Sequence, residues 1–116
     1  MSSNNDQILP NEVKIKLEKP FEDERGGIQP LVDLTMKSCV LISSKKGTIR
    51  ANHYHKTDWH FCYVLEGEID YYHRKVGDKE APKLEKIKKD ELFFTPSMVE
   101  HAMVFHKDTS FLTLGG

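Results

Sequence analysis

Short apolar runs separated by turn residues occupy most of this chain and restrict what it can fold into. Val13, Ile15 and Leu17 alternate with charged residues, which is the period-2 pattern of a half-buried strand. Further runs rich in aromatic and β-branched residues follow, with turn residues between them about every 8 to 12 positions. No segment shows a sustained helical period. The pattern predicts an all-β protein of about nine or ten short strands, built as a sandwich or jelly-roll barrel.

The positions of proline and glycine set the predicted boundaries. Residues 1–11 are polar and patternless, which predicts a flexible tail before a single domain over residues 12–116. Residues 21–27 are predicted to form a charged turn before a short strand at residues 28–31. The apolar residues 39–42 predict a strand buried on both faces, within residues 36–43. Later strands are predicted at residues 49–54, 59–65, 68–73, around 84–87, 92–95, 100–105 and 109–114.

Size and charge narrow the classes of partner. A chain of 116 residues with a net charge of -1 forms one core and offers no general attraction to nucleic acid or to an anionic membrane. It has no apolar run near the roughly 20 residues of a membrane span and no signal-peptide pattern, so a cytoplasmic protein is predicted. Cys39 and Cys62 lack metal-site or disulfide spacing and are predicted to be reduced, buried thiols.

Four of the six histidines have spacings that converge in a β protein. His53 and His55 share one face of a strand, and a bend at residues 56–58 returns the next strand with His60 beside them. His101 can join them from a neighbouring strand. Neutral imidazole is the commonest protein ligand of first-row metals. We therefore expect one divalent transition metal, Fe, Mn, Ni, Zn or Cu, bound by these four side chains.

The same residues resemble the first cupin motif, which spans about residues 47–67 here. That motif reads Gly, five residues, His-x-His, three or four residues, Glu, six residues, Gly. Gly47, His53, His55 and Gly67 match it, and His60 occupies the glutamate position. An imidazole in place of a carboxylate removes one negative charge, which would make a bound metal a stronger Lewis acid.

The second cupin motif is matched less completely, at about residues 90–105. Pro96 and His101 are present, whereas Asp90, Met98 and Phe105 replace its two glycines and its asparagine. The resemblance covers roughly residues 36–114. It implies a double-stranded β-helix barrel, a metal held inside by the four histidines, and a homodimer, because cupins commonly pair through an edge strand. Residues 13–17 are the strand predicted to extend or cross that dimer.

A narrower resemblance points to sugar nucleotides. Residues 21–27 are similar to the F-x-D-x-R-G element by which dTDP-4-dehydrorhamnose 3,5-epimerases and related dTDP-sugar isomerases contact their ligand. Residues 50–54 resemble their R-G-x-H-Y element, whose histidine is the general base. The resemblance implies that Arg25 and Arg50 bind the diphosphate. Those epimerases usually bind no metal there, and the chain ends before the region of their catalytic tyrosine, so 3,5-epimerisation itself is not expected.

The sequence therefore favours a metal-dependent, isomerase-like or epimerase-like cupin enzyme that acts on a small polar molecule such as a sugar or sugar nucleotide. Tyr54, Tyr63 and Glu100 are candidate proton carriers, with Tyr71 a further one. Phe105 is a candidate ligand contact among aromatic residues whose main expected role is core packing. Two alternatives stay open, an Fe- or Cu-dependent dioxygenase and a non-catalytic cupin that binds a small ligand or a metal.

Overall fold

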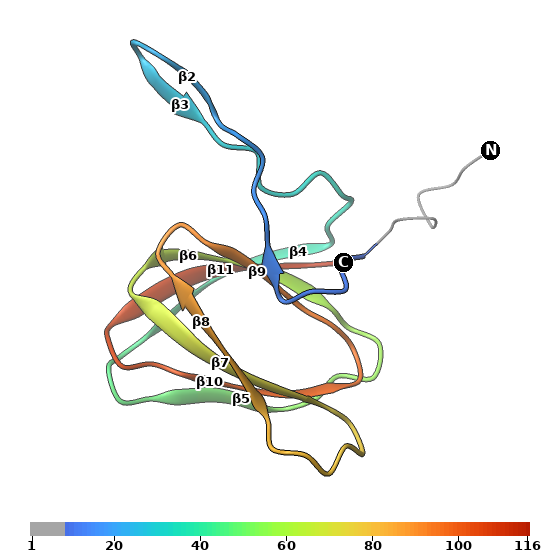
Figure 1. Ribbon diagram of the computed structural model, residues 1–116. Coiled ribbons are helices and arrows are strands. Elements are labelled where there is room, and N and C mark those ends of the chain that lie inside the picture. Colours follow the sequence, from blue (N-terminus) through green and yellow to red (C-terminus); the bar gives the residue numbers. More distant parts are fainter. Residues whose placement is uncertain (1–8) are drawn as a thin grey trace, which may run out of the picture.

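The structure, a computed structural model, describes residues 9–116 and confirms the all-β class (Figure 1). Those residues form strands and loops without any helix, and so contain none that could cross a membrane. Residues 1–8, which make up most of the predicted flexible tail, lie outside the described part. Leu9 packs against hydrophobic residues of the barrel.

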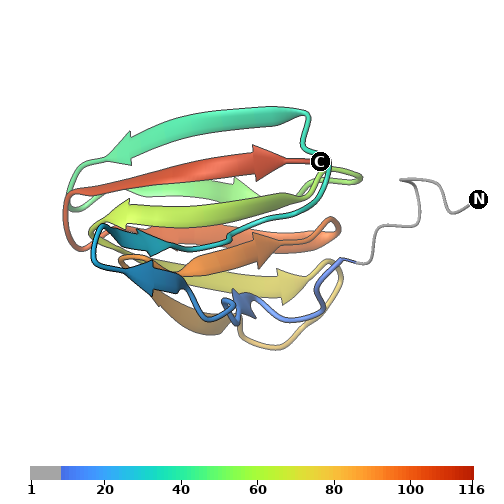
Figure 2. The same cartoon turned by 90° about the horizontal axis from the view of Figure 1, so that it is seen from above.

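Two antiparallel sheets face each other to form the barrel (Figures 1 and 2). The five-stranded sheet contains, in spatial order, β1 (Lys14–Ile15), β9 (Leu92–Thr95), β6 (His60–Glu66), β11 (Thr109–Gly115) and β4 (Ser38–Ser44). The four-stranded sheet contains β5 (Ile49–His53), β10 (Val99–Val104), β7 (Glu68–Lys75) and β8 (Lys83–Lys88). A small hairpin of β2 (Phe21–Asp23) and β3 (Gly26–Ile28) stands away from the barrel.

The core lies between the two sheets and follows the period-2 pattern of the sequence. On β10, His101 and Met103 are buried and are followed by buried Phe105, as their alternation predicts. Both sheets contribute to one cluster of buried side chains, which contains Cys62, Val64, Ile69, Tyr71, Ile87, Phe93, Met103, Phe105 and Phe111. Burial raises the pKa of the Cys62 thiol, so this cysteine is a protonated packing residue.

The prediction that residues 39–42 are buried on both faces is wrong. β4 is an edge strand, so one side has no neighbouring strand within the described part of the chain, and Val40 and Leu41 are 49% and 65% exposed. Cys39 is also exposed, contrary to prediction, although both cysteines are free thiols. Only Ile42 of this run packs against the core.

The N-terminal part also differs from the predicted pattern. Residues 21–28 form a hairpin in which Phe21 pairs with Ile28, so the predicted turn contains two short strands. The strand predicted at residues 28–31 ends at Ile28, since Pro30 provides no N–H for a sheet. β1 is only two residues long and pairs with β9 of its own sheet. The homodimer through residues 13–17 remains a prediction.

The turn at Gly67 gives a first test of the fold. Gly67 has φ +85°, and an added Cβ would lie against the Thr109 hydroxyl and 2.5 Å from the Asp108 carbonyl oxygen. We expect Gly67→Ala to lower the free energy of unfolding by about 2 to 3 kcal/mol, because strain and a backbone clash combine. Gly77→Ala is the matched control, since Gly77 has φ +86° with open space around it. Urea unfolding measures the loss of stability in both variants. Equal losses of unfolding free energy would contradict a clash specific to Gly67.

Candidate active site

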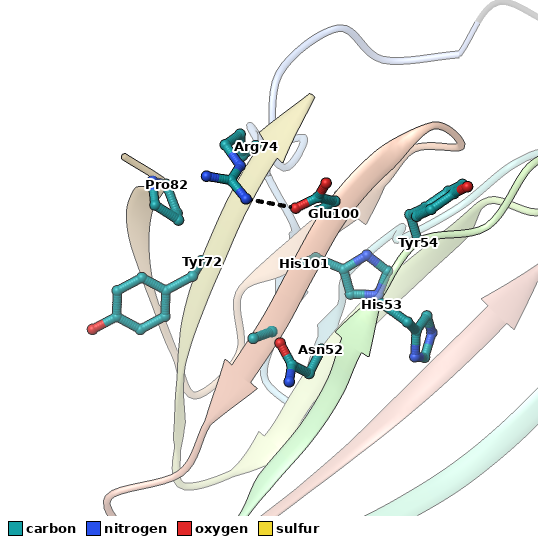
Figure 3. Close-up of a pocket in the computed structure, with 9 residues that line it drawn as sticks. Asn52, His53, Tyr54, Tyr72, Arg74, Pro82, Glu100 and His101 are labelled. Atoms are coloured by element: carbon teal, nitrogen blue, oxygen red, sulfur yellow. Dashed lines mark hydrogen bonds and ion pairs between the residues drawn. The ribbon is translucent and has the colours of Figure 1, made fainter. Parts of the chain in front are cut away.

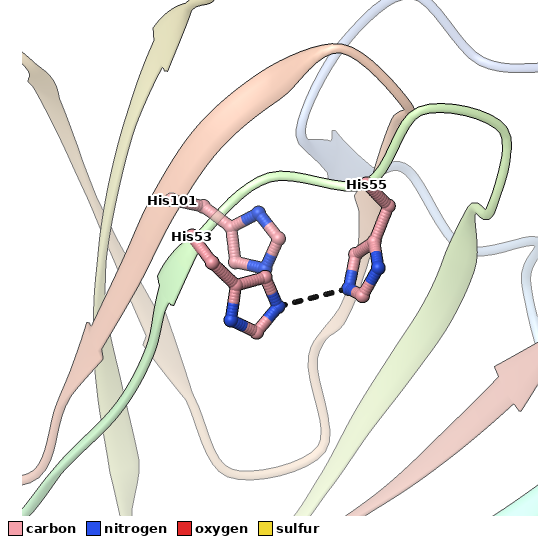
Figure 4. A group of neighbouring side chains, drawn as sticks. All are labelled: His53, His55 and His101. Carbon is pink, nitrogen blue, oxygen red and sulfur yellow. Dashed lines mark hydrogen bonds between the residues drawn. The ribbon is translucent and has the colours of Figure 1, made fainter.

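Three of the four predicted ligands converge at one edge of the four-stranded sheet (Figure 4). His53 ends β5 and is the direct cross-strand partner of His101 on β10, and His55 follows two residues later. One ring nitrogen of each histidine lies within 4.8 Å of those of the other two. The Nε2 atoms of His53 and His55 are 2.9 Å apart. The site has no carboxylate within this group, so its donor set is all nitrogen.

A β-bulge positions His53. Ala51 pairs with Ala102 and His53 pairs with His101, so Asn52 is one extra residue in β5, and the register shifts there. Ala51 and Asn52 have φ 69° and 60°, in the left-handed region that non-glycine residues seldom adopt. Such conformations are retained where the surrounding structure imposes them, often at functional sites. Simple strand alternation did not reveal this bulge.

Backbone carbonyls orient two of the rings. Nδ1 of His53 lies 3.0 Å from the Ala51 oxygen, and Nδ1 of His101 lies 3.2 Å from the Val99 oxygen. When each Nδ1–H donates to its carbonyl, Nε2 is free to bind a metal, which is the usual outer-sphere arrangement of metal-binding histidines. Burial, with the neighbouring histidines, lowers the pKa of His101 to about 4, so the ring is neutral at pH 7. The three histidines thus fit a divalent transition metal.

The fourth predicted ligand, His60, borders this group without joining it. Its ring centroid is 5.8 Å from that of His55, and its nitrogens lie outside the group of three. Burial, and then the nearby His55, lower its pKa. Gly115 leaves room for the ring, since a Cβ there would be 3.4 Å from Nε2 of His60. Ligation by His60 stays a prediction.

A cavity of about 460 Å³ opens beside the histidines (Figure 3). Two candidate proton carriers, Tyr54 and Glu100, line it together with His53 and His101. An Nη2 nitrogen of Arg74 donates to Glu100 at 2.8 Å and holds the carboxylate in place. The remaining lining residues are Asn52, Tyr72, Arg74, Pro82 and Ala102. Sequence reasoning missed Arg74 and Tyr72, although both alternate along β7 with buried Tyr71.

The other candidates on the barrel lie away from this cavity. The Tyr63 hydroxyl donates to Asp90 at 3.2 Å, and burial, with Asp90, raises the pKa of this tyrosine. Phe105 is fully buried, with its ring stacked on Phe111, so it packs in the core and is not among the residues that line the cavity beside the histidines. Tyr71 is also fully buried, inside the barrel.

The two predicted anion-binding arginines are far apart within one chain. Arg50 donates to the Ser44 hydroxyl and, at 2.9 Å, to the Ser43 carbonyl. It lines a cavity of about 630 Å³ with hydroxyl-bearing residues of β4 and β11. Arg25 lies on the hairpin that projects away from β5 (Figure 1) and is ion-paired with Asp23 at 2.6 Å. That arginine lowers the pKa of Asp23.

Comparison with known proteins agrees with this fold. The family model described as a cupin domain matches residues 40–114, so the chain belongs to the cupin family. None of the curated proteins matches the chain in sequence.

Solved structures of sugar-nucleotide enzymes share the fold. The sugar 3,4-ketoisomerase QdtA from Thermoanaerobacterium thermosaccharolyticum, in complex with TDP, is 19% identical with a TM-score of 0.72, over 93% of this chain and 82% of that one. The TDP-fucose-3,4-ketoisomerase WlaRA from Campylobacter jejuni is 17% identical with a TM-score of 0.74, over 92% and 82%. The dTDP-4-dehydrorhamnose 3,5-epimerase from Sulfolobus tokodaii is 15% identical with a TM-score of 0.68, over 87% and 74%.

Proposed function

We propose that this cupin is a metal-dependent isomerase or epimerase-like enzyme whose substrate is a sugar nucleotide. The observation that carries the proposal is the cluster of three imidazoles beside a cavity that also contains a phenol and a carboxylate. The similarity to structures of TDP-sugar ketoisomerases supports the substrate class.

The residues of the site suit proton transfer next to a carbonyl group. Moving a carbonyl to the neighbouring carbon first requires removal of a proton from that carbon and delivery of a proton to the carbonyl oxygen, which gives an enediol. The neighbouring hydroxyl then loses its proton, and the former carbonyl carbon gains one. Tyr54 is the group that would exchange these protons, since it lines the cavity next to His53 and His101. Glu100 also lines the cavity, but it precedes core-facing His101 on β10, so its carboxylate lies on the outer face of the sheet, where Arg74 holds it. A metal held by His53, His55 and His101 would polarise the carbonyl oxygen as a Lewis acid.

A turnover experiment tests this function. The protein, loaded in turn with Fe(II), Mn(II), Ni(II), Zn(II) or Cu(II), is incubated with TDP-4-keto-6-deoxyglucose, and the sugar is followed by NMR. We expect a shift of the carbonyl to carbon 3 or a change of configuration next to it. Tight binding of TDP without any change in the sugar would instead support the non-catalytic alternative. Oxygen uptake with substrate under Fe(II) or Cu(II) would support the dioxygenase.

Arg50 gives a prediction for the nucleotide. A guanidinium that binds a diphosphate contributes a charge-assisted hydrogen bond, so Arg50→Ala is expected to weaken TDP binding by about tenfold. Isothermal titration calorimetry measures the change. Lys16→Ala is the matched control, because it removes the same charge from an exposed position outside the cavity that Arg50 lines. Equal affinities for the two variants would remove Arg50 from the nucleotide site.

A further inference from the structure

A second polar pair lies inside the barrel, on β7 and β8. Nε2 of His73 is 3.3 Å from a carboxylate oxygen of Glu85, and the two side chains are only 18% and 33% exposed. Glu85 pairs directly with Tyr71, and Ile87 pairs directly with Ile69. Those three partners are fully buried, and alternate residues share a face, so Glu85 and His73 point toward the core side. A carboxylate at such a position is costly unless it has a function or a partner.

The ring of Tyr71 connects this pair to the histidine cluster. It stacks on His73, with centroids 5.4 Å apart and planes 20° apart, and on His101, at 5.8 Å and 29°. The Tyr71 hydroxyl is buried without a hydrogen-bond partner among residues 9–116, which is unusual for a polar group in a folded protein. Burial, with Cys62 and Glu85 nearby, raises its pKa, so the hydroxyl stays protonated and can donate. His73 is itself the direct cross-strand partner of His101.

His73 of this pair borders a cavity. His73 lines a space of about 780 Å³ that also contacts residues 10–13, just before β1, and Lys83 of β8. Lys83 is the cross-strand partner of His73 and adds an ammonium donor. The apolar part of the cavity wall comes from Val13, Phe94 and Pro96. The wall also contains acidic and basic side chains, among them Glu12, Arg74 and Glu80, so the cavity offers several hydrogen-bonding groups to a hydroxyl-rich ligand.

We propose that His73, held in place by Glu85, forms a second subsite that binds a hydroxyl group of a sugar ring, in the cavity between β8 and the N-terminal segment. Glu85 fixes the ring of His73 by accepting from Nε2–H, so Nδ1 accepts a hydrogen bond from one ligand hydroxyl. Lys83, which lines the same cavity, donates to a ligand oxygen. This proposal rests on the proposed function and extends it, since His73 is the cross-strand partner of His101 and would add a hydroxyl contact to a sugar held at the histidine cluster.

Calorimetry with two ligands separates the subsite from the nucleotide site. We measure the affinities of TDP and TDP-glucose for the wild type, Glu85→Gln and His73→Phe. Both variants are expected to lose about tenfold in TDP-glucose affinity and to keep the wild-type affinity for TDP. The matched control is His106→Phe, since His106 forms a similar pair, 3.1 Å from Asp70, but is exposed outside the barrel. An unchanged TDP-glucose affinity, or equal losses for both ligands, would overturn the subsite.

Histidine-ring NMR tests the subsite without a nucleotide. The outcome for the subsite is therefore separate from the outcome for the proposed function. Methyl α-D-glucoside is titrated to high concentration, and the ring signals of His73 and His106 are followed. We expect the His73 signals to shift and those of His106 to stay in place. If TDP fails to bind while the His73 signals shift, the proposed nucleotide substrate is contradicted and the sugar subsite is supported. Unchanged His73 signals would overturn the subsite. If His73→Phe does not fold, Glu85→Gln still tests the subsite by calorimetry.

Discussion

His101→Ala is expected to lower the bound transition metal from about one ion per chain to near zero. His101 is the most buried of the three converging histidines, and only two donors of that group would remain without it. Loss of an outer-sphere partner already costs about 10- to 100-fold in metal affinity, so loss of a ligand should cost about 100-fold or more. Mass spectrometric metal analysis of wild type and variant, after equal reconstitution, measures the difference.

Two further variants make the metal experiment specific. His106→Ala removes an exposed imidazole on the outside of the barrel and should leave the metal content unchanged. His60→Ala reports whether the fourth histidine is a ligand, since a loss comparable to that of His101→Ala would place it in the site. A wild type that stays metal-free after reconstitution would contradict the centre. It would then favour an epimerase-like site in which His53 is a free base.

Strand alternation predicted the parts of the site that depend on local geometry. His53 and His55 meet, and His101 reaches them from the neighbouring strand, as the spacing of the histidines indicates. The alternation of residues 100–105 also predicted that His101 and Met103 share one face of their strand, and the structure buries both. The core-facing positions of His101 and Met103 follow from the two-residue repeat of a strand. His55 lies beyond the end of β5, so its contact with His53 follows from their short separation in the chain and not from strand alternation.

Features that depend on the order of strands in a sheet could not be predicted in this way. Val40 and Leu41 belong to an apolar run typical of a central strand, yet β4 has only one neighbour. Nothing within the run tells a central strand from an edge strand. The bulge at Asn52 could not be predicted either, because neither of the two residues with left-handed backbone angles is a glycine and no proline lies beside them.

The polar pair inside the barrel was missed for a different reason. β8 contains Lys83, Glu85 and Ile87 on one face, so its pattern indicates a strand with little core contact. The structure turns that face inward, where Glu85 meets His73. Charged residues at core-facing positions are thus the sites where reasoning from hydrophobic pattern fails and where a functional role should be sought.

Phe93→Ala is expected to lower the free energy of unfolding by about 3 to 5 kcal/mol, the usual range for deleting a buried aromatic ring. Phe93 is fully buried on β9, 5.2 Å from the Tyr71 ring, so its loss leaves a cavity between the two sheets. Phe21→Ala is the matched control, since Phe21 is 59% exposed on the hairpin and should cost at most about 0.5 kcal/mol. Urea unfolding at two protein concentrations measures both. Similar losses would contradict the assigned core, and a Phe21→Ala loss that depends on concentration would show that the hairpin packs against a second copy of the chain.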